Sequence, residues 1–415
     1  MIPYPVLSTT ALVVVHVKSV LRALRHRLLH HPVRMLSRRL ASHLKRVSAR
    51  SFASTSSISA SHNHWSTNHS EPSSQTVNLV EVGPRDGLQN EKSGIISVET
   101  KVELIERLVR AGVTNVEAGS FVSPKWVPQM AGTSEVLKSL YHVPSVHYAV
   151  LVPNAKGLSD LLSLLASNPS SPSSPPLTDE ISVFTAATSS FTRANLNCTV
   201  AESLQKIAPV VREARDRGLR VRGYVSVVVY CPFEGRVESR KVRDVAKELL
   251  EMGCYEVSLG DTVGQARPHE VAEMLEEVLT ELPAEKLAGH FHDTYGTGVA
   301  NVLTAVPYGI RTIDASVGGL GGCPYSPGAT GNVATEDVIY ALQESGYRVA
   351  GSWTGDSSSD FSGRGTVDLE QLVDIGWWIS EKLGRQNASR VGRAVKARRE
   401  REEKQREKEK EKSKL

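Results

Sequence analysis

The most constraining feature of this 415-residue sequence is a series of eight short apolar segments that alternate with amphipathic helical patterns. The short segments are typical of buried strands, whereas the stretches between them carry apolar residues at spacings of three and four. Repeated strand–helix units form parallel sheets, and eight of them close into an α/β fold, the (β/α)8 TIM barrel. The predicted strands cover residues 77–82, 115–118, 146–151, 180–185, 220–228, 255–259, 287–292 and 311–316.

Helices and insertions complete the predicted domain. Helical patterns cover residues 97–111, 200–217, 239–252, 268–282 and 298–308, and residues 367–383, with Trp377 and Trp378, are expected to form a closing helix over the barrel. Two stretches rich in Ser, Pro and Gly, 167–176 and 351–365, predict surface insertions. We therefore place the barrel domain at residues 75–384, with additional C-terminal helices and disordered, charged ends.

The net charge of +4 hides an uneven distribution along the chain. Residues 1–70 contain 10 Lys and Arg and no acidic residue, and residues 385–415 contain 13 Lys and Arg with 6 Glu. Subtracting both ends from the 49 basic and 45 acidic residues leaves 26 and 39, a net charge of −13 for the barrel region. Nucleic-acid binding needs basic side chains clustered on a folded surface, so this acidic body predicts no nucleic-acid partner.

Both ends of the chain resemble targeting signals. Residues 1–70 are rich in Arg, Ser and His, which is typical of a mitochondrial transit peptide; a disordered basic arm is the alternative. The chain ends in Ser413, Lys414 and Leu415, a tripeptide that directs import into peroxisomes, although it is also compatible with the chance ending of a charged helix. We expect a protein of the mitochondrial matrix with a peroxisomal fraction, because the transit segment emerges first from the ribosome.

Cysteine spacing and hydropathy exclude other classes of protein. Cys198, Cys231, Cys254 and Cys323 lie far apart without a CxxC pair, which argues against a zinc ribbon or a disulfide framework and indicates a reducing compartment. The apolar run at 11–17 is far shorter than the about 20 residues that span a bilayer. We expect no transmembrane helix, and we expect the first three cysteines to serve packing.

Residues suited to chemistry lie where the predicted strands end. Active sites of (β/α)8 barrels are built from the loops at the carboxyl ends of the strands, so these positions are the candidates for a site. They are Arg85 and Asp86 after the first strand, Glu117 at the end of the second, Asp261 after the sixth, His290 and His292 on the seventh, and a glycine-rich loop at 318–331 after the eighth.

A metal site is the first hypothesis for these residues. His290 and His292 are two positions apart on a predicted strand, so their side chains leave the same face and can bind one ion. Asp86 and Asn332 also follow strand ends. Two imidazoles with carboxylate and amide oxygens suit Mg²⁺, Mn²⁺ or Zn²⁺. The alternative is a pair of hydrogen-bonded barrel histidines without an ion.

Seven motifs lie in order along the predicted barrel: VEVGPRDGLQNE at 80–91, SFVSPKWVPQM at 120–130, RGYVS at 222–226, GDT at 260–262, HFHDTYG at 290–296, GLGGCPY at 319–325 and GNVATED at 331–337. Through these motifs the sequence resembles, from about residue 75 to residue 350, the hydroxymethylglutaryl-CoA lyases, a metal-dependent barrel group that makes and breaks bonds next to acyl-CoA thioesters. Members that condense acetyl-CoA with oxo acids share the Arg-Asp and HxH elements but differ in the last loop, where Cys-Pro-Tyr is a lyase feature.

This resemblance implies retro-Claisen cleavage of 3-hydroxy-3-methylglutaryl-CoA to acetyl-CoA and acetoacetate, assisted by Mg²⁺ or Mn²⁺. Asp86, His290, His292 and Asn332 would hold the ion. Breaking the C2–C3 bond requires loss of the C3 hydroxyl proton and leaves a thioester enolate that must be stabilised and then protonated. His290 is implied as a proton shuttle as well as a ligand, and the division of acid and base roles between His290 and Asp86 stays open.

The resemblance also implies roles for residues around the ion. Arg85 would place its guanidinium on the thioester oxygen where negative charge develops, although a salt bridge to Glu117 or Asp261 is also expected. Cys323 would protonate the acetyl-CoA carbanion from the glycine-rich loop, where an inert buried cysteine would find little core around it.

Other side chains would support this chemistry from the edge of the site. Structural pairing is the alternative for two of them, Glu117 and Glu336. The substrate-binding set is Arg85, Gln89, Glu117 and Asp261, and Glu336 would hydrogen-bond behind the ion's own ligands.

Three alternative functions stay open. Gly119 and Phe291 depart from the usual lyase pattern, so the substrate could be another 3-hydroxy-3-alkylglutaryl-CoA. A condensing enzyme would need a further C-terminal domain, for which the residues after Gly384 are too few and too charged. A non-catalytic scaffold would have no need for Arg85, Asp86, Cys323 and the metal ligands together.

The partner that we expect is an acyl-CoA substrate, and the expected oligomeric state is a homodimer.

Overall fold

The computed structural model describes residues 75–91, 94–171, 175–322, 331–352 and 365–413. Several sequence predictions fall on residues outside these ranges: the transit segment at 1–70, Cys323, most of the second insertion, and the final Lys414 and Leu415. The fold and the site below are built from the described residues.

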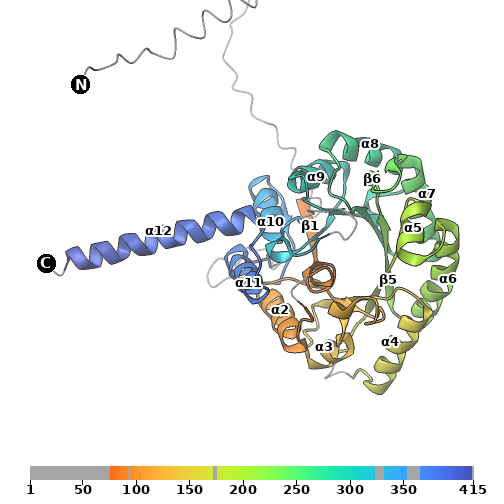
Figure 1. Ribbon diagram of the computed structural model, residues 1–415, viewed down its shortest axis with the longest axis horizontal. Helices are drawn as coiled ribbons and strands as arrows, with labels where there is room; N and C mark the ends of the chain where they lie inside the picture. Colours follow the sequence, from red (N-terminus) through yellow and green to blue (C-terminus); the bar gives the residue numbers. More distant parts are fainter. Residues whose placement is uncertain (1–74, 92–93, 172–174, 323–330, 353–364, 414–415) are drawn as a thin grey trace, which may run out of the picture. The chain divides into compact units, whose positions relative to one another are not determined.

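A parallel sheet closes into a barrel because β1 pairs with β10, where Leu79 aligns with Ile313. All eight predicted strands are confirmed, and they follow one another around the barrel in the order β1, β2, β3, β4, β5, β8, β9, β10 (Figure 1). The short β11 (Arg348–Val349) pairs with the first residues of β1. The barrel strands are β1 (Thr76–Glu81), β2 (Asn115–Ser120), β3 (His147–Leu151), β4 (Glu180–Ala186), β5 (Arg220–Ser226), β8 (Glu256–Asp261), β9 (Leu287–Phe291) and β10 (Thr312–Ala315).

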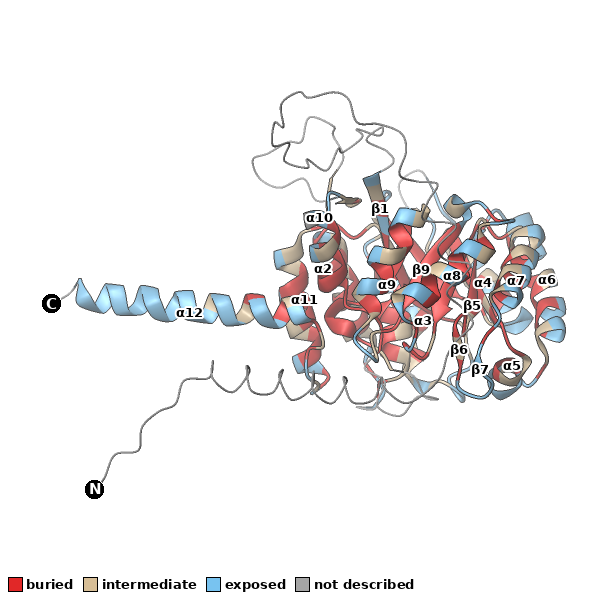
Figure 2. Cartoon of the chain, turned by 90° about the horizontal axis from the view of Figure 1, so that it is seen from above, coloured by how far each residue is buried: buried red, intermediate tan, exposed pale blue. Residues whose placement is uncertain are grey.

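Helices surround the barrel and turn their apolar sides toward the strands, so that the strands and the inner helix faces are buried (Figure 2). In α2, for example, Leu104, Ile105 and Leu108 are fully buried, and the Ser97 side chain caps the helix by accepting from the Thr100 N–H. These helices are α2 (Val98–Arg110), α3 (Thr133–Ser139), α4 (Ala155–Ser167), α5 (Ser189–Leu196), α6 (Val200–Asp216), α7 (Ser239–Met252), α8 (Pro268–Val278), α9 (Gly298–Ala305) and α10 (Thr335–Glu344).

Two further helices follow the barrel. The predicted closing helix is confirmed as α11 (Leu369–Lys382). The disordered C-terminal end predicted from the charge pattern is wrong for residues 390–412, which form the helix α12 (Arg390–Lys412). Lys, Arg and Glu favour helices, Ser389 caps this one, and Arg399 pairs with Glu370 and Asp374 of α11, which together offset the charge density.

Three of the cysteines serve packing. Cys198, Cys231 and Cys254 are buried and form no disulfide, as expected from the sequence. Among the residues that the structure describes, no helix combines the length and apolarity that a membrane crossing requires.

Short elements complete the fold. They are the hairpin β6 (Tyr230–Cys231) and β7 (Gly235–Arg236), the π-helical turn η2 (Gly83–Gly87) and the 3-10 turns η3 (Pro128–Met130), η4 (Ala284–Lys286), η5 (Val306–Tyr308) and η6 (Val317–Gly319).

Glu81, the last residue of β1, ties the first strand to the loop after the last one. Its carboxylate is fully buried and accepts hydrogen bonds from the Gly83 N–H at 2.8 Å, the Val317 N–H at 3.0 Å and the Thr335 hydroxyl at 2.6 Å. Burial raises the pKa of Glu81 to about 7, despite these donors. The contacts join η2, η6 and α10 at the end of the barrel that carries the candidate site.

We predict that Glu81→Ala lowers the free energy of unfolding by about 3 kcal/mol or more, because it leaves three buried donors without an acceptor. Denaturant unfolding monitored by circular dichroism measures the change. Glu285→Ala, which removes an exposed glutamate from η4, is the matched control and should shift stability by less than about 0.5 kcal/mol. Equal stability of the two variants would contradict this role of Glu81.

Candidate active site

The turn η2 places Arg85 and Asp86 at the carboxyl end of β1. It begins at Gly83 and Pro84, and Gly87 lies so close to the next loop that a Cβ there would sit 2.8 Å from Leu320 Cβ. Glycine is therefore required at position 87 because the two loops approach each other closely. This approach brings the residues after β1 beside the residues after β10.

Asp86 lies at the centre of the candidate site. Its Oδ1 accepts from Arg85 Nη1 at 2.7 Å, and its Oδ2 accepts from Asn332 Nδ2 at 2.8 Å. The Nε2 atoms of His290 and His292 lie 4.0 Å and 3.8 Å from Asp86 Oδ2. These two distances are too long for hydrogen bonds.

The spacing and the chemistry of these atoms suit a divalent ion. The candidate ligand atoms of Asp86, His290 and His292 all lie within 4.8 Å of one another. Ligands that share one ion at about 2.1 Å lie roughly 3 to 4.2 Å apart, so only small shifts would be needed. Asn332, the fourth predicted ligand, presents its amide nitrogen to Asp86 Oδ2, so its oxygen would reach the ion after the amide turns.

Electrostatics keeps these candidate ligands in the protonation state that could bind a metal ion. Burial opposes ionisation of Asp86, but Arg85 and the two imidazoles outweigh it and lower the pKa of the carboxyl to about 2. Burial and, second, the neighbouring His290 lower the pKa of His292 to about 4. At neutral pH Asp86 is therefore ionised and His292 is neutral, as metal coordination requires.

Arg85 is fixed by the acids on either side. Its Nε donates to Glu117 Oε2 at 2.6 Å, which confirms the expected salt bridge to Glu117, while no bond to Asp261 forms. Glu117 also accepts from the hydroxyls of Ser182 and Tyr224. The guanidinium is thus held in place at the mouth of the barrel, where it can stabilise a developing negative charge.

The loop that carries Cys323 begins beside this cluster. Asn332 Nδ2 donates to the Leu320 carbonyl at 3.2 Å, and Asn90 Nδ2 donates to the Gly322 carbonyl at 3.0 Å. A Cβ on Gly331 would lie 2.5 Å from Gly321, so the two ends of the loop pass in direct contact. Cys323 itself, the next residue after Gly322, lies outside the described residues.

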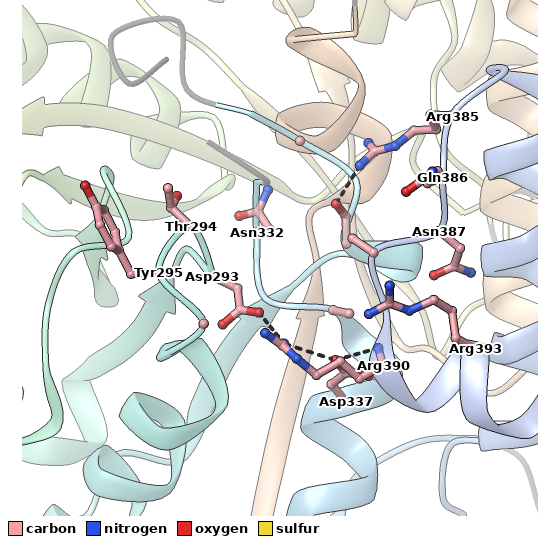
Figure 3. A pocket seen from close by; sticks show the side chains of 15 residues that line it. Asp293, Thr294, Tyr295, Asn332, Asp337, Arg385, Gln386, Asn387, Arg390 and Arg393 are labelled. Carbon is pink, nitrogen blue, oxygen red and sulfur yellow. Dashed lines mark hydrogen bonds and ion pairs between the residues drawn. The ribbon is translucent and has the colours of Figure 1, made fainter. Parts of the chain in front are cut away.

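A pocket of about 540 Å³ adjoins Asn332 between the loops after β9 and β10 and the segment that links α11 to α12 (Figure 3). Arg390 Nη1 donates to Asp293 Oδ2 at 2.5 Å, and Arg385 joins Glu91, at 2.5 Å, to the Gly319 carbonyl, at 3.1 Å. Residues just beyond 384, which the sequence analysis assigned to a tail, therefore contact the loops of the site.

Two predicted site residues do not meet the others. Asp261 is buried, its Oδ2 accepts from the Ala266 N–H at 3.0 Å, and burial raises its pKa to about 6. Glu336 accepts from the Gly318 N–H at 3.0 Å, and burial raises its pKa to about 8. The predicted residues that the structure brings together are Arg85, Asp86, Gln89, Glu117, His290, His292 and Asn332.

Two residues that contact the site were not predicted from the sequence. Asp314 contacts His290, and Arg385 contacts the loops that border the site. Asp314 accepts from His290 Nδ1 at 3.1 Å. A carboxylate inside a predicted buried strand, as at position 314, signals a buried ionic partner and could have been noticed. Arg385 had no comparable signal, because it stands among the other basic residues of the C-terminal end.

Comparison with known proteins identifies the family. The sequence matches the family described as HMGL-like over residues 76–375. The chain belongs to the HMGL-like family. A 3-hydroxy-3-isohexenylglutaryl-CoA/hydroxy-methylglutaryl-CoA lyase from Pseudomonas aeruginosa is 47% identical over 322 residues, 78% of this chain and 98% of that protein. The mitochondrial hydroxymethylglutaryl-CoA lyase of Bos taurus is 46% identical over 319 residues, 77% of this chain and 89% of that protein.

A solved structure of a similar protein agrees in fold. The crystal structure of hydroxymethylglutaryl-CoA lyase from Pseudomonas aeruginosa superimposes with a TM-score of 0.70 at 46% identity, covering 78% of this chain and 98% of that chain. The predicted barrel and the predicted family are therefore both confirmed.

We predict that His292→Ala weakens Mn²⁺ binding by about 100-fold or more, because it removes one of the two candidate nitrogen ligands. Isothermal titration of the metal-free protein measures the dissociation constant. His269→Ala, at an exposed position of α8, is the control and should bind as the wild type does. Unchanged Mn²⁺ affinity in His292→Ala would make the two histidines structural.

Proposed function

We propose that this HMGL-like protein cleaves 3-hydroxy-3-methylglutaryl-CoA into acetyl-CoA and acetoacetate, as a carbon–carbon lyase that uses Mg²⁺ or Mn²⁺. The observation that carries the proposal is Asp86, placed between the guanidinium of Arg85 and the Nε2 atoms of His290 and His292 at the barrel mouth. A metal ligand set and a fixed cation side by side are what an alkoxide and an enolate require. The names of the relatives support the same reaction.

Asp86, His290, His292 and Asn332 would hold the ion, which would lower the pKa of the substrate's C3 hydroxyl and orient its oxygens. Asp86 or His290 accepts the hydroxyl proton. The electron pair of that O–H bond then forms the ketone of acetoacetate, and the C2–C3 bond breaks. Its electrons move to the thioester, which becomes the enolate of acetyl-CoA.

Arg85 stabilises the enolate oxygen, because Glu117 and Asp86 hold its guanidinium in one place before substrate binds. Cys323 donates the proton that C2 needs to become the methyl group of acetyl-CoA. The proton taken from the hydroxyl returns to the thiolate directly or through solvent, so the reaction needs no net proton. Asn90, by holding Gly322, anchors the chain immediately before Cys323.

Other predicted residues take supporting places in this proposal. Gln89, whose Nε2 lies 3.4 Å from Asp86 Oδ1, and Glu117 border the substrate side of Arg85. Asp261, which is fully buried and accepts from the Ala266 N–H, is proposed to support the substrate side indirectly, by holding the loop after β8. Glu336 supports the site indirectly, by holding the Gly318 N–H beneath the last loop.

The acyl chain is the part of the proposal with a second candidate. One relative is named as a lyase for both 3-hydroxy-3-isohexenylglutaryl-CoA and the methyl compound. Phe291, between the two histidines, is buried and cannot itself contact a longer chain without rearrangement. The methyl substrate is therefore the first choice and the longer 3-hydroxy-3-alkylglutaryl-CoA the alternative.

We further propose a homodimer in the mitochondrial matrix with a peroxisomal fraction. The basic, acid-free residues 1–70 and the mitochondrial relative from Bos taurus support the first location. Ser413, Lys414 and Leu415 support the second.

The purified protein should release acetoacetate from 3-hydroxy-3-methylglutaryl-CoA only when Mg²⁺ or Mn²⁺ is present, because the hydroxyl must lose its proton at neutral pH. A coupled spectrophotometric assay for acetoacetate, before and after chelation, measures this. The isohexenyl substrate, assayed in parallel by kcat/KM, separates the two acyl candidates.

Cys323→Ala is the diagnostic variant in the same assay. It should keep Mn²⁺ affinity but lose about 10² to 10⁴ in kcat, since the proton donor is gone while the ion site is intact. A fully active Cys323→Ala would show that the thiol takes no part in the reaction. In the chelation experiment described above, turnover that persists without the ion would refute the metal role.

Cell fractionation tests the proposed subcellular localisation. Deleting residues 1–70 should move the protein from mitochondria to peroxisomes, because only the C-terminal tripeptide then remains. Further deletion of Ser413, Lys414 and Leu415 should leave it in the cytosol. A full-length protein that is cytosolic and unaffected by either deletion would refute both signals.

A further inference from the structure

The two histidines of the candidate metal site are held differently from behind. His290 Nδ1 lies 3.1 Å from Asp314 Oδ2, whereas His292 Nδ1 has no hydrogen-bond partner among the described residues. Both imidazoles are buried, so neither nitrogen is freely hydrated. This asymmetry distinguishes two ligands that are equivalent in the sequence pattern.

The barrel itself brings Asp314 to His290. The two residues are direct partners in the parallel pairing of β9 with β10, so their side chains leave the same face of adjacent strands. Asp314 thus meets Nδ1, while Nε2 of the same ring faces Asp86. The His290 ring therefore lies between two carboxylates, that of Asp314 next to Nδ1 and that of Asp86 on the side of Nε2.

Asp314 is surrounded by donors and can only accept. Its Oδ1 accepts from Arg222 Nη2 at 2.8 Å, and its Oδ2 accepts from Ser258 at 2.7 Å and from Arg222 Nη1 at 3.2 Å. A carboxylate bound in two places by a guanidinium stays ionised. The hydrogen in the contact with His290 must therefore sit on the imidazole Nδ1.

Arg222 explains how this carboxylate can be buried at all. Its side chain is almost fully buried, and its Nε donates to Glu256 Oε2 at 2.8 Å on the side away from Asp314. A buried guanidinium is tolerated when acids pair with it, and here two carboxylates do so. Only one of the two, Asp314, also contacts His290, so Glu256 offers a matched comparison.

We propose that Asp314 is the positioning residue of the metal site, which keeps the proton of His290 on Nδ1 and leaves the Nε2 lone pair free to bind the ion. This inference rests on the metal role in the proposed function. It also bears on the base role: with Nδ1 committed to Asp314 and Nε2 to the ion, His290 has no nitrogen left to take the hydroxyl proton.

The test compares Asp314→Asn with Glu256→Gln in the intact protein. Both changes remove one negative charge from Arg222, but only the first reaches His290. Asp314→Asn should weaken Mn²⁺ binding, measured by titration, by about 10- to 100-fold, the usual effect of losing a carboxylate behind a histidine ligand. Glu256→Gln should stay within about 3-fold of the wild type. Equal weakening in both, or none in Asp314→Asn, would overturn the proposal.

The histidine tautomer is a second measurement that needs no variant. Nitrogen-15 NMR of the wild type, with Mn²⁺ removed, should show His290 protonated on Nδ1 and unprotonated on Nε2. The opposite tautomer would overturn the proposal, even if Asp314→Asn failed to fold. If Mn²⁺ binds, the tautomer is as expected and Asp314→Asn weakens binding, but no acetoacetate is released, the proposed reaction fails while the role of Asp314 is supported.

Discussion

Closure of the barrel by the pairing of β1 with β10 is the constraint on which the site depends. Asp86 follows the first strand, and Asn332 follows the last, 246 positions later, yet their side chains are hydrogen bonded at 2.8 Å. An open sheet with the same strands would leave these two ends at opposite edges. Glu81 also stabilises the closure, because its carboxylate accepts hydrogen bonds from backbone N–H groups of both η2 and η6.

Charge burial is the second organising feature of the barrel mouth. Two buried arginines, Arg85 and Arg222, each bind two carboxylates, and each also lies near the ring of Tyr224. The cost of burying such groups is offset only when the partners are held at good geometry, and the strands supply that geometry. The result is a set of charges fixed before substrate arrives, which is what stabilisation of a developing negative charge requires.

The segment between α11 and α12 gives the C-terminal region a structural part in the site. The Ala388 N–H donates to the Gly318 carbonyl, Arg385 joins Glu91 to Gly319, and Asp337 accepts from the backbone of Arg390 and Val391. These contacts fasten the loops after β1 and β10 to one another.

The sequence by itself determined the strand–helix alternation and the barrel, and it placed Asp86, His290 and His292 near one another, because periodicity and strand-end position are local properties that can be recognised without coordinates. It also anticipated the pairing of Arg85 with Glu117. Tertiary structure alone decided that Asp261 and Glu336 turn toward backbone N–H groups and that residues 390–412 form a helix. It also decided that Asp314 contacts His290 Nδ1, while His292 Nδ1 has no such partner in the described part of the chain. The physical reason is that these outcomes depend on which donors surround each buried carboxylate, and those donors come from strands and loops far away in the chain.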